Sequence, residues 1–207
     1  MKGEVKFFQY NAIGMCKITG VMNNKTIQPM KYRRIAVLAA CAAGALCLAG
    51  ADKPSLNPHL APLAPLLGKT WKGTLKNSKP DQPIVDVEHW ERALNGQAVR
   101  LVHSINQGVY GGETMFIWDE KKQTVAYYYF TTDGFMSTGT LRVKDGHFVT
   151  TEQVTGDADG ITEVRGTSEI QPDGKFHVKA ECLKNGQWAP HHEVTYEEDP
   201  TSEVIFK

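Results

Sequence analysis

Hydrophobic and polar residues alternate along most of the chain after residue 70. The alternating runs are short and rich in β-branched and aromatic residues, which is typical of strands with one buried face. The pattern predicts ten strands, at residues 70–76, 84–94, 97–107, 113–118, 123–131, 135–143, 147–154, 161–171, 175–184 and 187–197.

The breaks between these runs are short and carry turn residues. Asn-Gly or Asp-Gly pairs, which tolerate the positive φ of tight hairpins, occur at residues 95–96, 133–134, 145–146, 159–160, 173–174 and 185–186. The longest gap, 77–83, is too short for a helical lid, which leaves one barrel mouth uncovered. We therefore predict an all-β fold, an antiparallel up-and-down barrel of about ten strands. A two-sheet sandwich is the alternative, but its Greek-key connections need longer crossovers.

A short apolar segment precedes the first strand. Leucines at positions 60, 63, 66 and 67 form a helix-like face, and Pro62 and Pro65 limit that helix to about one turn. We assign residues 52–66 to a linker or plug and residues 67–207 to the barrel domain.

The first 51 residues resemble a targeting segment. A cationic stretch at 30–34 precedes an apolar run at 35–48, and small residues at 49 and 51 predict signal-peptide cleavage after Ala51. The run is shorter than the roughly 20 residues of a spanning helix, so we expect no stable membrane span. A lipoprotein box at 38–41, with Cys41 acylated, is the alternative. Residues 1–29 precede this complete signal peptide, and we assign them to an upstream start, with Met30 as the true initiator.

The charge balance differs between these two segments. Residues 1–51 hold seven basic residues and one acidic residue, whereas residues 52–207 hold 16 basic and 22 acidic residues. The exported part is therefore acidic, which argues against a nucleic-acid partner. The exported part would keep only Cys182, so no internal disulfide is possible. We expect the exported barrel to be a monomer.

Hairpin geometry predicts which side chains face the barrel lumen. A two-residue turn at 185–186 pairs Ala180 with His191 and places His191 and Glu193 inside, on the same face as Phe176 and Cys182. A bulge at position 190 would exchange His191 with His192.

The turn at 95–96 pairs Glu88 with His103 and Trp90 with Leu101, and it leaves Glu91 and Arg100 as an outer ion pair. Polar side chains inside a barrel indicate a wet cavity, because an unpaired buried polar group costs about 1–3 kcal/mol. In the run 127–130, neighbours alternate faces, so either Tyr127 and Tyr129 or Tyr128 and Phe130 line that cavity. The candidate lumen residues are thus His191, Glu193, Glu88, His103, Trp90, Tyr127, Tyr129, Phe176 and Cys182.

Several motifs resemble those of known barrel families. Gly68 and Trp71 resemble the Gly-x-Trp opening of lipocalins, which implies that the Trp71 indole plugs one barrel end. Residues 66–71, 89–96, 110–114 and 188–196 resemble a bacterial lipocalin-like, calycin-type family of unknown function, over about residues 60–198. The strand count and the Gly-Lys-Thr-Trp start also resemble nitrobindins, which implies haem with His191 as its axial ligand.

These observations favour a binding protein over an enzyme. The chain has no nucleophile elbow, P-loop or Rossmann glycine pattern, although Glu88 with His103, or His191 with Glu193, could act as an acid-base pair. We place no metal site, because the histidines do not converge as zinc requires. We expect an exported barrel that binds a small, mostly apolar molecule. The alternatives are a nitrobindin-like haem protein and a structural envelope protein with a filled barrel.

Overall fold

The fold comes from a computed structural model that describes residues 55–157 and 159–207. The upstream start, the signal peptide with its cleavage after Ala51 and the alternative lipoprotein Cys41 all lie outside the described residues. In the described part, no helix is both long and apolar enough to cross a bilayer.

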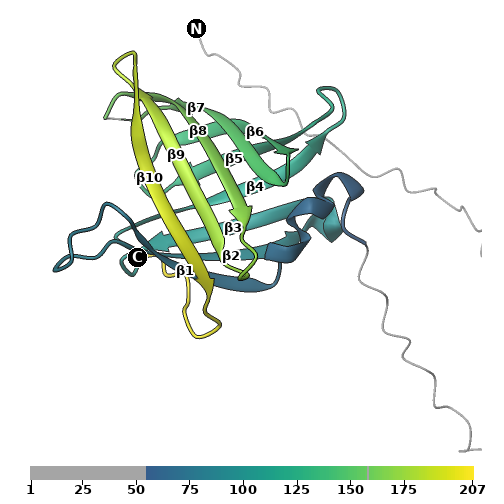
Figure 1. The fold of residues 1–207 in the computed structure, drawn as a ribbon. Helices are drawn as coiled ribbons and strands as arrows, with labels where there is room; N and C mark the ends of the chain where they lie inside the picture. The colour runs from purple at the N-terminus through teal and green to yellow at the C-terminus, as the bar shows by residue number, and fades with distance from the viewer. Residues whose placement is uncertain (1–54, 158) are drawn as a thin grey trace, which may run out of the picture. The chain divides into compact units, whose positions relative to one another are not determined.

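Ten antiparallel strands form one closed barrel, as the sequence predicts (Figure 1). Each strand pairs with its neighbours in the chain, and β1 pairs with β10 to close the sheet. The strands are β1 (Lys69–Leu75), β2 (Val85–Ala93), β3 (Ala98–Ile105), β4 (Tyr110–Asp119), β5 (Thr124–Thr131), β6 (Met136–Lys144), β7 (His147–Thr155), β8 (Ile161–Ile170), β9 (Phe176–Lys184) and β10 (Gln187–Glu198). A short 3₁₀ turn, η2 (Leu94–Gly96), joins β2 to β3.

One strand begins earlier than its sequence pattern indicates. The alternation suggests a start at residue 113, whereas β4 begins at Tyr110 and includes two glycines. A side chain at Gly112 would collide with the ring of Tyr129 and the carbonyl oxygen of Phe130. Gly112 is therefore a strand residue that gives an aromatic ring room to lie across the sheet.

The segment before β1 forms a 3₁₀ helix of nine residues, η1 (Pro58–Leu66), which is longer than the single turn expected from its prolines. The Leu-Ala-Pro repeat has a period of three, and a 3₁₀ helix has three residues per turn, so Leu60, Leu63 and Leu66 align in one row. Proline fits because its fixed φ lies within the 3₁₀ range. Asn57 caps the start by accepting a hydrogen bond from the backbone N–H of His59 at 3.0 Å.

η1 closes one end of the barrel. Its three leucines are at most 1% exposed and pack in a cluster with Trp71. The indole N–H of Trp71 donates to the Leu66 carbonyl at 3.4 Å. The remaining members of the cluster are Trp90, Val99, Phe116, Val125, Tyr127, Leu141, Phe148, Phe176, Val194 and Tyr196. This half of the barrel is a packed apolar core.

The opposite end carries the hairpins that join β1 to β2, β3 to β4, β5 to β6, β7 to β8 and β9 to β10 (Figure 1). The β1–β2 connection, residues 76–84, contains one isolated bridge, between Lys79 and Gln82, and no helix. As the sequence suggests, no helical lid lies between the first two strands.

We predict that Leu63→Ala lowers the free energy of unfolding by about 2–5 kcal/mol, because it leaves a cavity beneath Trp71 in the closed end. Leu94→Ala is the matched control, since Leu94 is 67% exposed and should change stability by less than about 0.5 kcal/mol. Urea denaturation followed by tryptophan fluorescence measures both values. Equal effects of the two substitutions would contradict a closing role for η1.

Candidate functional site

The open half of the lumen is lined by two chemically different walls. Strands β2 to β5 contribute a polar wall, whereas β8 and β9 contribute an apolar wall. The inward residues of the polar wall are Asp86, Glu88, His103, Tyr110 and Tyr129, and those of the apolar wall include Val164, Val178, Ala180 and Cys182. Val164, Val178 and Tyr129 point inward and remain partly exposed.

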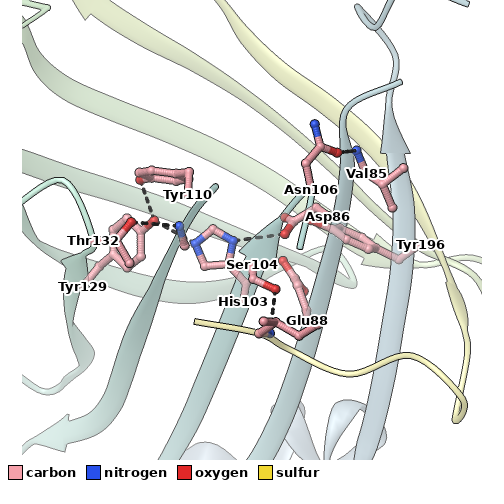
Figure 2. A network of polar contacts seen from close by, with 12 residues as sticks. Val85, Asp86, Glu88, His103, Ser104, Asn106, Tyr110, Tyr129, Thr132 and Tyr196 are labelled. Atoms are coloured by element: carbon pink, nitrogen blue, oxygen red, sulfur yellow. Dashed lines mark hydrogen bonds and ion pairs between the residues drawn. The ribbon is translucent and has the colours of Figure 1, made fainter. Parts of the chain in front are cut away.

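A hydrogen-bonded chain runs across the polar wall (Figure 2). His103 Nδ1 lies 3.1 Å from Asp86 Oδ1, and His103 Nε2 lies 2.8 Å from the Tyr129 hydroxyl. The Tyr129 hydroxyl in turn lies 2.7 Å from that of Tyr110. On the other side, the Tyr196 hydroxyl donates to Asp86 Oδ2 at 2.8 Å. Four strands, β2 to β5, supply the chain from Asp86 to Tyr110, and β10 supplies Tyr196.

The charge of His103 sets the direction of this chain. Burial lowers the pKa of His103, but the hydrogen bond and charge of Asp86, with the charge of Glu88, outweigh burial and raise the pKa above its usual value. A protonated His103 donates from both nitrogens, so Tyr129 must donate to Tyr110. The neutral ring, donating from Nδ1 to Asp86, accepts from Tyr129, whose oxygen then accepts from Tyr110. The Tyr110 hydroxyl thus has its O–H free to donate when His103 is protonated, and it has only its oxygen free to accept when His103 is neutral.

Glu88 lies beside this chain in a dry setting and is 9% exposed. Burial, together with repulsion from Asp86, raises its pKa to about 7 against the opposing effects of Trp90 and His103. The indole N–H of Trp90 donates to Glu88 Oε2 at 3.0 Å. Glu88 can therefore exchange a proton near neutral pH.

Glu152 is a third carboxyl group in the lumen, on β7. It pairs with Gly139 of β6 and Val164 of β8, and its Oε2 accepts from the Tyr127 hydroxyl at 3.3 Å. A side chain at Gly139 would collide with the Tyr127 ring, so this glycine makes room for the contact. Burial raises the pKa of Glu152 to about 7.

The predicted pairing of His191 with Ala180 and the predicted inward position of Glu193 are wrong. A bulge between Pro190 and His192 shifts the register, so that His192 and not His191 pairs with Ala180. His191 is exposed at the bulge, and Glu193 pairs with outward Lys179. Because proline has no N–H to give to the ladder, position 190 favours such a bulge.

Glu193 belongs to an outer ionic cluster. Its Oε1 lies 2.8 Å from Lys76 Nζ and 3.5 Å from His177 Nε2. His192, by contrast, points into the lumen, and burial with the nearby charge of His191 lowers its pKa to about 4. His192 is therefore a neutral imidazole at physiological pH, with no hydrogen-bond partner among the described residues.

The other predicted lumen residues do point inward. Glu88 pairs with His103 and Trp90 with Leu101, as expected, and Glu91 forms the outer ion pair with Arg100 at 2.7 Å. Tyr127 and Tyr129 are the inward pair of the tyrosine run, whereas Tyr128 and Phe130 are exposed. Phe176 and Trp71 belong to the packed core, and Cys182 is a buried free thiol opposite Ala189.

Sequence reasoning missed Asp86, Tyr110, Glu152 and Tyr196. Alternation alone could have found Asp86, since it is two residues from Glu88 on the same strand. The β6–β7 register set by the turn at 145–146 would likewise have placed Glu152 on the inward face. Tyr110 lay before the predicted strand start, and the face of Tyr196 depended on the bulge.

These side chains offer hydrogen-bond donors and acceptors and proton exchange, on a rigid frame of strands. In the described part of the chain, no group of three or more His, Cys, Asp or Glu side chains is arranged to hold a metal ion. Asp86, His103 and Glu88 could orient a polar ligand group or exchange a proton with it.

Comparisons with known proteins support the fold class. No protein-family model matches the chain, and no curated protein matches it. Among solved structures, the chain is similar to Rv2717c from M. tuberculosis, with 15% sequence identity and a TM-score of 0.53. The match covers 70% of this chain and 99% of that one. At this identity the likeness shows a shared barrel fold.

We predict that Asp86→Asn lowers the pKa of His103, because the charge and hydrogen bond that oppose burial are removed. An NMR titration of the His103 ring resonances measures this shift. Asp145→Asn, in the β6–β7 turn at the opposite end, is the control and should leave the titration unchanged. An unchanged His103 pKa in Asp86→Asn would contradict the pairing.

Proposed function

We propose that this protein is an exported barrel that binds a small molecule in the open half of its lumen. The ligand has a mostly apolar body and at least one polar group. The apolar wall of β8 and β9 suits the body, and the hydrogen-bonded chain from Asp86 to Tyr110 suits the polar group. Pockets of this composition, apolar with a few placed polar groups, are typical of ligand sites.

The observation that carries this proposal is the contrast between the two barrel halves. The half near η1 is a packed apolar cluster, whereas some inward side chains of the other half, among them Val164 and Tyr129, stay partly exposed. A barrel that served only as a structural element would gain stability by filling both halves. Buried ionisable groups beside these partly exposed inward side chains favour binding over a purely structural role.

Export rests on the sequence of the first 51 residues, namely the cationic stretch, the apolar run and the small residues before Asp52. The acidic barrel that remains has a single cysteine, so it needs no disulfide to reach its folded state outside the cytosol.

We predict that protein isolated from its native host begins at residue 52 and carries a bound small molecule, both measurable by native mass spectrometry. We also expect it to bind the neutral dye Nile red. Val164→Trp should weaken dye binding by about five- to a hundredfold, since a large inward side chain occupies the lumen at a cost of about 1–3 kcal/mol.

Thr167→Trp is the matched control, because Thr167 lies on the same strand and is exposed on the outer face. It should leave Nile red binding unchanged. A native protein that carries no small molecule and also fails to bind the dye would refute lumen binding. A mature N-terminus at a lipid-modified Cys41 would refute cleavage after Ala51 and support the lipoprotein alternative.

Haem binding is the second candidate function, and one observation favours it. His192 is a neutral, inward imidazole without a protein partner among the described residues, which suits an axial ligand. His191, the residue to which the nitrobindin resemblance assigns this role, lies in the bulge before His192 and is exposed. A haem here would supply an iron centre for small-molecule or redox chemistry.

We predict that, if haem is the ligand, haemin added to the protein gives a shifted Soret band that His192→Ala abolishes and His191→Ala preserves. Absorption spectroscopy of the wild type and the two variants measures this. A shift that survives in both variants would indicate adventitious haemin, and the absence of any shift would exclude the haem function.

A further inference from the structure

The hydrogen-bonded chain on the polar wall has a buried end and an end near the open mouth. At the buried end, Asp86 Oδ2 accepts from the hydroxyl of Tyr196, which is 3% exposed. At the other end, Tyr110 is the first residue of β4 and is half-buried (Figure 2). Among the residues that the structure describes, the Tyr110 hydroxyl makes a single hydrogen bond, to Tyr129. Tyr110 therefore ends the chain with a hydrogen-bonding position left for a ligand.

Neighbouring rings hold the Tyr110 side chain in place. Its ring meets the His103 imidazole edge-on, with the ring centroids 5.8 Å apart. It also stacks with Phe135 from the β5–β6 turn, with the centroids 6.5 Å apart and 21° between the ring planes. A polar contact that orients a ligand works best when packing of this kind fixes its position. The Tyr110 hydroxyl thus has a fixed place in the lumen wall.

The protonation state of His103 decides what the Tyr110 hydroxyl presents. When His103 is protonated, it donates to Tyr129, Tyr129 donates to Tyr110, and the O–H of Tyr110 is free. The positive charge also polarises the hydrogen bonds that follow it, which makes Tyr110 a stronger donor. When His103 is neutral, Tyr110 uses its O–H on Tyr129 and keeps only an acceptor position.

The surroundings of His103 favour its protonated form. Burial lowers the pKa of His103, but the hydrogen bond and charge of Asp86, with the charge of Glu88, raise it above its usual value. The free group at the end of the chain is then a donor, so the ligand must supply an acceptor. An anionic acceptor is unfavourable, because the carboxyl groups of Asp86, Glu88 and Glu152 also point inward. An uncharged carbonyl oxygen meets both requirements.

We propose that Tyr110 is the residue that contacts the polar group of the lumen ligand, and that this group is an uncharged carbonyl oxygen that accepts from Tyr110 while His103 is protonated. This inference rests on the proposed lumen binding and names the polar group of the ligand. The apolar wall of β8 and β9 holds the rest of the ligand. Loss of the His103 proton weakens the contact, because Tyr110 then gives its O–H to Tyr129.

Other charged or titratable groups surround this chain, from the β5–β6 turn and from strands β2, β7, β9 and β10. They are Asp133, Asp86, Glu88, Glu152, Lys184, His192 and Tyr196. Burial raises the pKa of Glu88 and of Glu152 to about 7, so both lose a proton over a range in which His103 also titrates. The test must therefore separate their titration from that of His103.

The test compares 2-octanone with 2-octanol in NMR titrations that follow the methyl resonances of Val164 on the apolar wall. The two ligands share one carbon skeleton, but only the alcohol can donate a hydrogen bond. We expect ketone affinity to fall about tenfold as the pH rises from about 5.5 to about 9, with its midpoint at the pKa measured for His103. Alcohol affinity should change less than about threefold, because the alcohol can donate to Tyr110 when His103 is neutral.

Two tyrosine variants test the route from His103 to the ligand. Tyr110→Phe should lower ketone affinity about tenfold at about pH 5.5 and remove its pH dependence. Tyr129→Phe should remove the pH dependence alone, because the Tyr110 O–H is then free at every pH. Tyr128→Phe is the matched control, since Tyr128 lies on the outer face of β5 and is 42% exposed, and it should change neither quantity. Thermal unfolding confirms that each variant is folded.

Three carboxyl variants separate the titration of His103 from that of its neighbours. Glu152→Gln and Glu88→Gln each remove one group that titrates near neutral pH, and the pH dependence of ketone binding should persist in both. Asp86→Asn should move the midpoint of ketone binding to lower pH, together with the pKa of His103. In every variant, the midpoint should follow the His103 pKa measured in that variant.

The outcomes separate this inference from the proposed function. Ketone affinity that is equal in the wild type and in Tyr110→Phe, or pH dependence that disappears in either glutamine variant, would overturn the role of Tyr110 and His103 while leaving lumen binding intact. So would Nile red binding in the absence of binding by either the ketone or the alcohol. Failure of Nile red as well would overturn lumen binding itself.

Discussion

The pairing of β1 with β10 is the contact on which the rest of the molecule depends. Five residues of β1 pair with β10, from Trp71 opposite Glu198 to Leu75 opposite Val194. This pairing turns a linear meander into a closed barrel and removes both sheet edges. Closure also encloses a lumen, so alternate residues of every strand point into the same interior.

The packed half of that lumen controls the chemistry of the open half. Leu60, Leu63, Leu66 and Trp71 seal one end, and the aromatic core above them keeps water away from Glu88. Low polarity there raises the pKa of Glu88, and burial does the same for Glu152 across the barrel. Burial therefore raises the pKa values of Glu88 and Glu152 to about 7, whereas the same carboxyl groups on the surface would ionise at acidic pH.

Much of the fold could be predicted because its signals are local. Asn185 and Gly186 both have positive φ, 53° and 77°, as a tight hairpin requires. The pairing of Glu88 with His103 follows from the turn at 95–96 and the period of two. Alternation likewise separates Tyr127 and Tyr129 from Tyr128. The candidate site was predicted less completely, because a single bulge at Pro190 turned Glu193 outward and His192 inward.

The sequence by itself determined the all-β class, the ten strands and the inward face of most of them, since strand alternation and turn residues act over a few positions. Tertiary structure alone decided which inward groups meet. Asp86, His103, Tyr129 and Tyr110 come from four strands, and Tyr196 reaches Asp86 from β10, 110 positions along the chain. No local pattern encodes such contacts, because they depend on how the sheet curves when it closes.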